Sequence, residues 1–171
     1  MIDPTQLMIK AGHSGFYRFL LNVMLNRIVP FNKPHGFKVI EITKEKVKIL
    51  IPYKKRNLNH IRGLHATALA TLSEFTTGLM LLKVLGAKKY RIILQKLEIE
   101  YHYQGKTDAT AEFIADDSWF EEKVYSPLTS EDKVVVPCRV NIHDVHGNHL
   151  TSAVIYWQIK PWNKVKTKVQ L

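Results

Sequence analysis

The sequence predicts an α+β domain in which a mostly antiparallel, curved sheet wraps around one long central helix, with a further helix at the N-terminus. Residues 63–82 are almost all apolar or small and contain no proline, which suits a helix of about 30 Å. On either side of this segment, apolar residues recur at every second position, as in half-buried strands. Short turns join these strands and favour antiparallel neighbours. An apolar helix among such strands must be covered by the sheet, which therefore curves around it.

Residues 5–28 are expected to form the N-terminal helix, because the apolar positions from Phe16 onward fall close to one helical face. Pro30 and Pro34 end this helix. Packing against the rest of the domain is the simpler interpretation, and a helix lying on a membrane surface is the alternative. The apolar stretch is short and is not followed by the small-residue cleavage site of a signal peptide.

Six strands are expected from the alternation of apolar and polar residues. They span residues 37–42, 47–51, 93–103, 109–115, 134–145 and 150–160. The clearest alternation follows the long helix, where one face carries Ile93, Leu97, Ile99, Tyr101 and Tyr103. Gln95 interrupts that face. Ser118 to Glu121 has the form of a helix capping box, which predicts a short helical turn, and residues 161–171 form a basic tail.

The long helix carries only two ionisable side chains between residues 63 and 82, His65 and Glu74. A charged residue in mid-segment is rare in a membrane span. The segment also contains five serines and threonines, and the residues that follow alternate like a sheet. We therefore interpret it as the buried helix of a folded domain and expect no transmembrane segment. Gly86 is placed to end the helix.

Length and composition limit the domain organisation and the partners. A chain of 171 residues is long enough for one core, so a single domain over residues 1–171 is expected, with its sheet and central helix within about 35–160. The single cysteine, Cys138, excludes an internal disulfide framework and favours a reducing, cytoplasmic setting. The net charge of +10 favours anionic partners. No zinc-finger, RNP or glycine-rich phosphate motif is present, so specific nucleic-acid recognition is not expected.

Three residues around the start of the long helix have a characteristic spacing. Asn59 is followed after six residues by His65 and then small residues, and nine residues after His65 comes Glu74. This pattern and the order of elements resemble the hotdog fold and, within it, the acyl-CoA thioesterases of the phenylacetate-pathway type. The resemblance covers about residues 35–160 and is closest to a hotdog branch whose members are mostly of unassigned function.

The resemblance implies a thioester hydrolase that acts on acyl-CoA or on an acidic acyl carrier protein, without a metal or cofactor. Glu74 is then the general base or the nucleophile, helped by apolar surroundings that raise its pKa. Asn59 orients the water or the carbonyl, and the backbone amide of Ala66 binds the oxyanion. The residues that line the site are His65, Gly63 and Thr67. In this family the carboxylate faces a loop of a second subunit, which implies a homodimer or a homotetramer.

The sequence also departs from the family pattern. Ala66-Thr67 stands where the family commonly has Gly-Gly, and the serine or threonine that many relatives carry near the start of the next strand is missing. The first departure favours a second interpretation, a non-catalytic hotdog module that binds an acyl chain or another protein. A hotdog dehydratase, with His60 or His65 as the catalytic histidine, is the third.

Each singled-out residue has a structural interpretation as well. Glu74 can be held in an ion pair by Arg62 or a histidine, and Asn59 can simply close its loop. Three histidines near the last turn have the look of a metal cluster: His143, His146 and His149. The Gly-Asn turn beside them, and the lack of carboxylate or cysteine ligand spacing, favour an exposed turn. We therefore expect no metal site.

Overall fold

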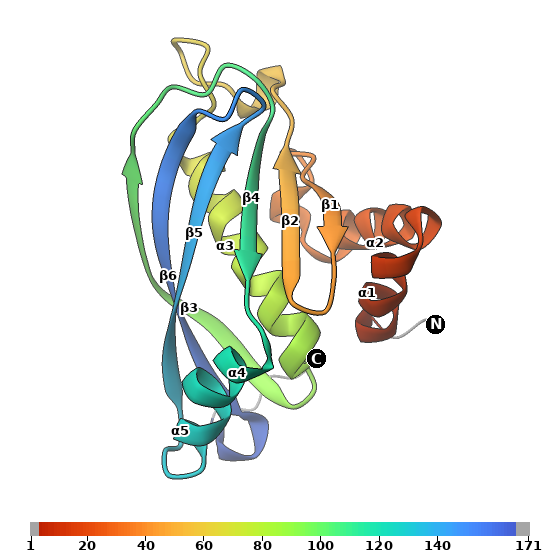
Figure 1. The fold of residues 1–171 in the computed structure, drawn as a ribbon, viewed down its shortest axis with the longest axis vertical. Coiled ribbons are helices and arrows are strands. Elements are labelled where there is room, and N and C mark those ends of the chain that lie inside the picture. Colours follow the sequence, from red (N-terminus) through yellow and green to blue (C-terminus); the bar gives the residue numbers. More distant parts are fainter. Residues whose placement is uncertain (1–3, 167–171) are drawn as a thin grey trace.

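One curved antiparallel sheet surrounds a long helix in the computed structural model, which describes residues 4–166 (Figure 1). The strands are β1 (Lys38–Ile42), β2 (Lys46–Ile51), β3 (Tyr90–Tyr101), β4 (Ala109–Ile114), β5 (Val134–Asp144) and β6 (His149–Pro161). The helices are α1 (Pro4–His13), α2 (Gly15–Ile28), α3 (Ala66–Leu85), α4 (Asp117–Phe120) and α5 (Ser126–Leu128). The strands pair in the order β1-β2-β4-β5-β6-β3, and every pair is antiparallel. The predicted α+β class and the sheet wrapped around one central helix are confirmed.

Helix α3 is buried on most sides because its apolar and small side chains leave no polar face. Eleven of its twenty residues are buried, and the hydroxyls of Ser73 and Thr76 donate to carbonyls of their own helix, so they are satisfied without water. The helix ends at Gly86, whose φ of 77° suits glycine. Its length and composition would allow a membrane span. Its burial within the sheet identifies it as the core helix of a folded domain.

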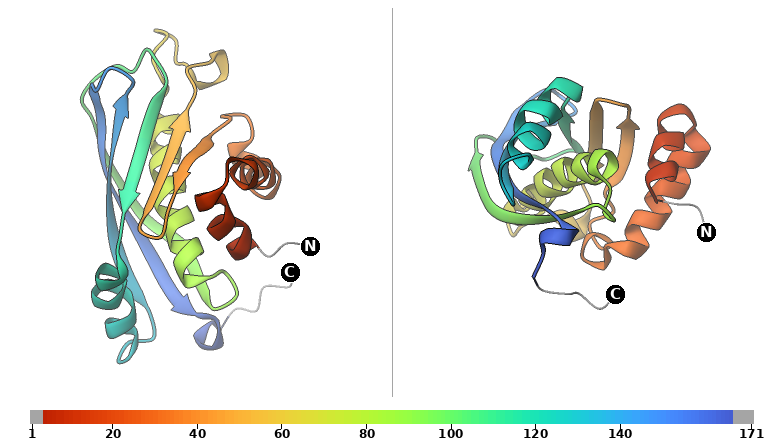
Figure 2. Two further views of the ribbon diagram at one scale, coloured as in Figure 1. Left: turned by 45° about the vertical axis from the view of Figure 1, so that its right-hand side comes forward. Right: turned by 90° about the horizontal axis from the view of Figure 1, so that it is seen from below.

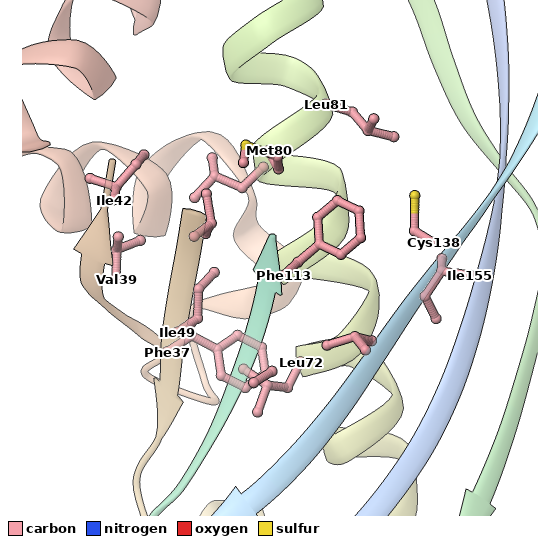
Figure 3. Packing of buried hydrophobic residues seen from close by; sticks show 14 of the residues in the cluster. Phe37, Val39, Ile42, Ile49, Leu72, Met80, Leu81, Phe113, Cys138 and Ile155 are labelled. Carbon is pink, nitrogen blue, oxygen red and sulfur yellow. The ribbon is translucent and has the colours of Figure 1, made fainter. Parts of the chain in front are cut away.

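The core fills the space between α3 and the concave face of the sheet (Figure 3). Figure 3 shows Leu72, Met80 and Leu81 of α3 among side chains from the sheet, which include Val39, Ile49, Phe113, Cys138 and Ile155. Burial raises the pKa of the Cys138 thiol to about 12, so this cysteine is a packing residue and not a reactive thiol. In most strands, the side chains that the alternation predicts to face inward are therefore the ones that lie in this core.

The predicted N-terminal helical segment is present, but the structure divides residues 5–28 between two helices. Ser14 separates α1 from α2 with an extended backbone, φ −147° and ψ 127°. The break lets α1 bury Leu7 and Met8 while α2 lies against it. Gly12 permits the close approach of α1 to β1, since a Cβ there would lie 2.7 Å from the carbonyl oxygen of Ile42.

Strand β3 changes face at Gln95, where its pairing with β6 contains a bulge between Leu94 and Lys96. As a result Ile93, expected on the inner face, is 46% exposed, whereas Ile92 and Leu94 pack against the core. The expected inward positions after the bulge, Leu97 and Ile99, do pack against the core. The two tyrosines at the end of the predicted apolar face, Tyr101 and Tyr103, are exposed.

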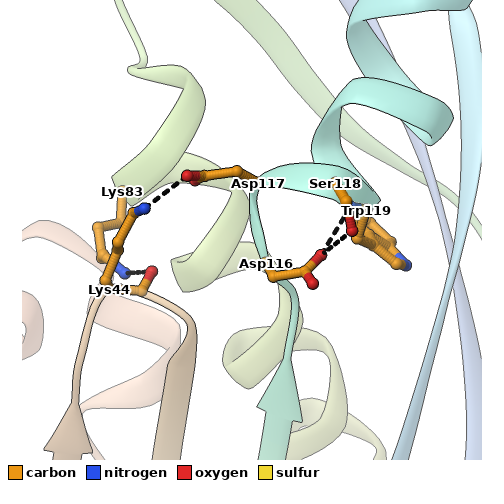
Figure 4. Close-up of polar contacts among 6 residues, drawn as sticks. All are labelled: Lys44, Lys83, Asp116, Asp117, Ser118 and Trp119. Atoms are coloured by element: carbon orange, nitrogen blue, oxygen red, sulfur yellow. Dashed lines mark hydrogen bonds and ion pairs between the residues drawn. The ribbon is translucent and has the colours of Figure 1, made fainter.

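The helical turn predicted around residues 118–121 is present, but its cap is one that the sequence reading missed. Asp116 is the N-cap residue of α4, and its Oδ1 accepts hydrogen bonds from the backbone N–H of Trp119 at 2.7 Å and from the hydroxyl of Ser118 at 2.8 Å (Figure 4). The Asp116 carboxylate is the cap, in place of the predicted Ser118, because both donors point to it. These two hydrogen bonds hold the pKa of Asp116 below its ordinary value.

A lysine pair links the β1–β2 turn to two other elements (Figure 4). The ammonium of Lys83 on α3 donates to the backbone carbonyl of Lys44 at 2.7 Å, and the ammonium of Lys44 pairs with Asp117 of α4 at 2.5 Å. Burial lowers the pKa of Lys83. The Lys44–Asp117 pair is exposed and contributes little stability, so the carbonyl contacts of Lys83 are what hold the turn on α3. The last part of the expected basic tail, residues 167–171, lies outside the described residues.

Candidate functional site

The loop that enters α3 ends in a histidine cap. His65 is the N-cap residue of α3, and its Nδ1 accepts a hydrogen bond from the backbone N–H of Thr67 at 3.2 Å and lies 2.8 Å from the Thr67 hydroxyl. Histidine replaces the usual serine or aspartate in satisfying one of the free N–H groups of the first turn. The ring of His65 is therefore engaged by its own helix.

Asn59 closes the loop before the helix. Its Oδ1 accepts hydrogen bonds from the backbone N–H groups of Ile61 at 3.1 Å and Gly63 at 2.9 Å. The Asn59 Nδ2 group donates to no residue within 4–166, so it is available to a ligand. Gly63 lies close to Gln104, whose side chain would have to shift to accommodate a Cβ at this position, 2.7 Å away. The loop-closing role and a ligand-binding role of Asn59 therefore use different atoms.

The N-terminus of α3 opens into a groove with a volume of about 310 Å³. The groove is lined by Asn59, Leu64, Ala66, Leu69, Tyr101, His102, Tyr103, Gln104 and Gly105. Within residues 4–166 the backbone N–H of Ala66 has no hydrogen-bond acceptor, and the hydroxyl of Tyr101 donates to the carbonyl of the same residue at 2.9 Å. Free N–H groups at a helix start bind negative charge. The groove can therefore accept an oxyanion beside Ala66.

Glu74 lies at a second, apolar cavity of about 550 Å³. One wall of this cavity is α3 and the other is formed by the N-terminal helices, with Met8, Met24 and Leu25 among the lining residues. Trp157 of β6 also lines it. Glu74 is the only ionisable side chain among the lining residues. An anion in such a lining is energetically costly unless it is paired or protonated.

The Glu74 carboxylate forms no hydrogen bond or ion pair with any residue from 4 to 166. The alternative interpretation, in which Arg62 or a histidine forms an ion pair with Glu74, is therefore wrong within residues 4–166 of one chain. Burial, which penalises the charged form, raises the pKa of Glu74 above its ordinary value. A carboxylate with a raised pKa is a stronger base than an ordinary glutamate, so unpaired Glu74 is suited to accept a proton from a substrate or from water.

The predicted working pair, Asn59 and Glu74, is not brought together within one chain. Ala66 and Glu74 are eight residues apart on α3, about 12 Å along the helix axis. Asn59 and Ala66 line the groove, whereas Glu74 lines the cavity. Within one chain, the three groups therefore lie at two separate places.

The histidines near the last turn stack instead of converging on one point. The ring of His149 lies 4.9 Å from that of His143 and 4.6 Å from that of His102, between ring centroids, while His146 sits in the turn itself. Within residues 4–166 there is no group of three or more histidine, cysteine or carboxylate side chains arranged to hold a metal ion.

Sequence reasoning missed two parts of the site. Tyr101, which contacts Ala66, was placed on an apolar strand face, and its exposure of 47% and hydroxyl contact appear only when β3 ends beside α3. The cavity wall formed by Met24 and Leu25 belongs to the N-terminal segment, for which the sequence predicts packing against the domain or contact with a membrane surface and no cavity. The alternation of Tyr101 and Tyr103 with polar residues is the one sequence signal that could have indicated a role for Tyr101 in the site.

Comparisons with known proteins place the chain in a family. A model for a domain of unknown function, DUF4442, matches residues 18–159. No curated protein matches the sequence. A Pseudomonas aeruginosa protein of unknown function, described as a probable thioesterase, superposes with a TM-score of 0.76 at 19% identity, over 84% of this chain and 95% of its own. A Haemophilus influenzae thioesterase superposes with a TM-score of 0.66 at 10% identity, over 84% and 90%.

A variant of a Staphylococcus aureus thioesterase has a TM-score of 0.60 at 16% identity, over 78% of this chain and 100% of its own. At such identities the likeness is one of fold. The family match spans most of the chain, including the loop, the groove and Glu74. The chain therefore belongs to the DUF4442 family of domains of unknown function and has the hotdog fold shared by these solved thioesterases.

Proposed function

We propose that the protein hydrolyses acyl thioesters of coenzyme A or of an acyl carrier protein at a site shared between two subunits. The observation that carries this proposal is the unpaired Glu74 carboxyl group, with its raised pKa, on the wall of an apolar cavity. The free backbone N–H of Ala66 at the start of α3 supports it, because thioester hydrolysis needs both a base and a group that binds the oxyanion. Structurally similar proteins described as thioesterases also support it.

The reaction can be written with these groups alone. The Glu74 carboxylate takes a proton from water, and the water oxygen bonds to the thioester carbonyl carbon. The carbonyl electron pair moves to oxygen, where the N–H of Ala66 and the Nδ2 of Asn59 donate hydrogen bonds. When the carbonyl re-forms, the C–S bond breaks, and the thiolate leaves with the electron pair and receives the proton from Glu74. Direct attack by Glu74, with an acyl-enzyme anhydride, is the alternative route.

A dimer would bring the two halves of the site together. Strand β3 is twelve residues long and stands at a sheet edge, with no strand paired to its outer side within residues 4–166. Long, unpaired edge strands are usually covered or paired in proteins. Pairing of β3 with β3 of a second subunit would extend the sheet and carry the groove of one subunit towards the cavity of the other. A homodimer is thus the smallest assembly that the proposal requires, and a homotetramer can be built from it.

The surroundings of the site suit a thioester with an apolar acyl group. The cavity volume of about 550 Å³ falls within the usual range for small-molecule sites, about 300–1,000 Å³, and its lining is suited to a hydrocarbon chain. The net charge of +10 attracts the phosphates of coenzyme A or an acidic carrier protein. Because the only cysteine is a buried thiol, a reducing cytoplasmic location is compatible with the fold.

Thiol release from a panel of acyl-CoA thioesters, from short to long chains and including aromatic acyl groups, tests the proposal. We expect turnover with substrates whose acyl group fits the apolar cavity, measured as free coenzyme A. Acyl carrier protein carrying the same acyl groups is assayed in parallel. The absence of thiol release from both kinds of substrate would contradict a hydrolase.

Complementation between two inactive variants tests the shared site. Glu74→Gln removes the base, and Asn59→Asp keeps the Oδ1 that closes the loop while removing the Nδ2 donor. Each variant alone is expected to be inactive. Random mixing of refolded subunits should restore about a quarter of the wild-type rate, because half of the dimers are mixed and each has one complete site of two. Failure to recover activity in a mixture shown to contain mixed dimers would place all groups of the site in one subunit.

A non-catalytic module that binds an acyl chain is the second candidate, favoured by the Ala66-Thr67 sequence at the helix start. Side chains there narrow the approach of a thioester to the free N–H groups, whereas the apolar cavity is unaffected. Binding of a free fatty acid without turnover of any thioester would favour this candidate. The dehydratase interpretation is less well supported, since the ring of His65 caps α3 and the ring of His60 forms no hydrogen bond with residues 4–166 that would orient it.

A further inference from the structure

The N-terminal helices α1 and α2 stand beside the β1 edge of the sheet (Figure 1, Figure 2). Helix α2 carries an exposed apolar stripe. The stripe, here called the α2 stripe, consists of Phe16, Phe19 and Val23. Phe16 is 65% exposed and Phe19 is 64% exposed. Six of the fourteen exposed large hydrophobic residues within residues 4–166 belong to residues 4–32. Exposed apolar side chains are therefore concentrated in this short segment beside the β1 edge of the sheet.

The stripe faces outward because the opposite side of α2 is anchored. Positions 16, 19 and 23 fall within about 60° of the helix circumference. On the opposite side Leu21 is fully buried. The Asn22 side chain accepts a hydrogen bond from the backbone N–H of Val39 at 2.7 Å and donates to the carbonyl of the same residue at 3.1 Å. These two bonds fix the rotation of α2 against β1, so the stripe cannot turn inward to join the core.

The same segment is purely basic. Residues 4–37 contain Lys10, Arg18, Arg27 and Lys33 and no aspartate or glutamate, although the whole chain has 15 acidic residues. None of the four forms an ion pair with any residue from 4 to 166. The ammonium of Lys10 lies 5.3 Å from the centroid of the Tyr17 ring, which leaves its charge uncompensated. An exposed apolar stripe on a helical segment whose only charged residues are lysine and arginine is a feature of helices that lie in a membrane interface.

We propose that α1 and α2 dock the protein on an anionic phospholipid surface, with the α2 stripe inserted at the level of the headgroups and the basic character of the segment attracting lipid phosphates. This inference is independent of the proposed hydrolase activity. A second copy of the chain fits the surface less well, because a two-fold contact through the stripe would bring together two segments that carry basic residues and no acidic ones. An anionic lipid surface instead complements both the charge and the apolar rings.

Sedimentation with vesicles tests the proposal on the full chain. Vesicles of equal parts phosphatidylglycerol and phosphatidylcholine are compared with vesicles of phosphatidylcholine alone. We expect the wild type to sediment with the anionic vesicles and binding to fall as salt is raised from low to physiological concentration. The double variant Phe16→Ser, Phe19→Ser should bind at least about tenfold more weakly, since both rings leave the interface.

A matched control is Ile114→Ser on β4, where an equally exposed apolar residue, 61%, lies outside the helices. This variant should bind like the wild type, and circular dichroism checks that all variants are folded. A charge variant, Lys10→Glu with Arg27→Glu, should lose binding to anionic vesicles. Equal binding by the Phe16/Phe19 double variant, or no binding by the wild type, would overturn the proposal. Self-association that the double variant abolishes, without vesicle binding, would assign the stripe to contacts between copies.

Discussion

Replacing Glu74 by glutamine is expected to lower thioester turnover by about 10²–10⁴-fold, because the amide cannot accept the proton that the attacking water must lose. The size and shape of the side chain are nearly unchanged, so substrate binding should be retained. The rate is measured as thiol release from the best substrate of the acyl-CoA panel. Glu45→Gln, at an exposed carboxylate in the β1–β2 turn, serves as a matched control and should leave the rate unchanged.

The pH profile of the wild type should identify the same group. Burial raises the pKa of Glu74 above 4.5, and the working form is the carboxylate, so turnover should rise with pH through the raised pKa and then level off. The profile is recorded as kcat and as kcat/KM between acidic and neutral pH. A rate that shows no inflection on the acidic side would assign the proton transfer to another group.

Loss of turnover in Glu74→Gln should not come from loss of folding. Because the pKa of Glu74 is raised in the folded chain, protonation favours the folded state. This contribution is fully present below the unfolded pKa and is lost as pH rises through the folded pKa. The glutamine variant does not titrate, so at pH 7 its free energy of unfolding should equal or exceed that of the wild type. Denaturant unfolding at pH 7 checks this, and a clear destabilisation there would contradict the account of Glu74 as an unpaired, partly buried acid.

Truncating Trp157 to alanine is expected to lower the free energy of unfolding by about 3–5 kcal/mol. The indole is 7% exposed and packs on α3 at Gly78, where a Cβ would lie 2.9 Å from the ring. Its Nε1 donates to the hydroxyl of Thr77 at 2.9 Å. The variant therefore loses both the packing of β6 on the helix and a buried hydrogen bond. The free energy is measured by denaturant unfolding.

Trp162→Ala provides the comparison for this variant. The indole of Trp162 also donates a hydrogen bond, to the carbonyl of Ala87 at 2.7 Å, but it is partly exposed and lies in a short 3-10 helix after β6. Its loss should cost about 1 kcal/mol. Equal destabilisation by the two substitutions would show that contact between β6 and α3 is not what Trp157 contributes.

Much of the fold could be predicted from local pattern. The long helix ends at Gly86, and the alternation of Leu97 and Ile99 places them inward, because the period of apolar residues in a chain reflects which face each element must bury. The two errors in the elements have another origin. The extended Ser14 and the bulge at Gln95 depend on how a helix meets β1 and how β3 pairs with β6, and no local period records either.

For the candidate site, the sequence by itself determined two things: which loop and helix carry the candidate residues, and that the pKa of Glu74 is raised. The spacing of Asn59, His65 and Glu74 located the loop and helix, and the apolar neighbours of Glu74 correctly indicated a raised pKa, since desolvation follows from composition. Only the tertiary structure decided that Ala66 lines the groove whereas Glu74 lines the apolar cavity, and that the N-terminal helices form one wall of this cavity. Those facts follow from the packing of α1 on α3 and of α2 on β1, contacts between residues far apart in the chain that no spacing within it encodes.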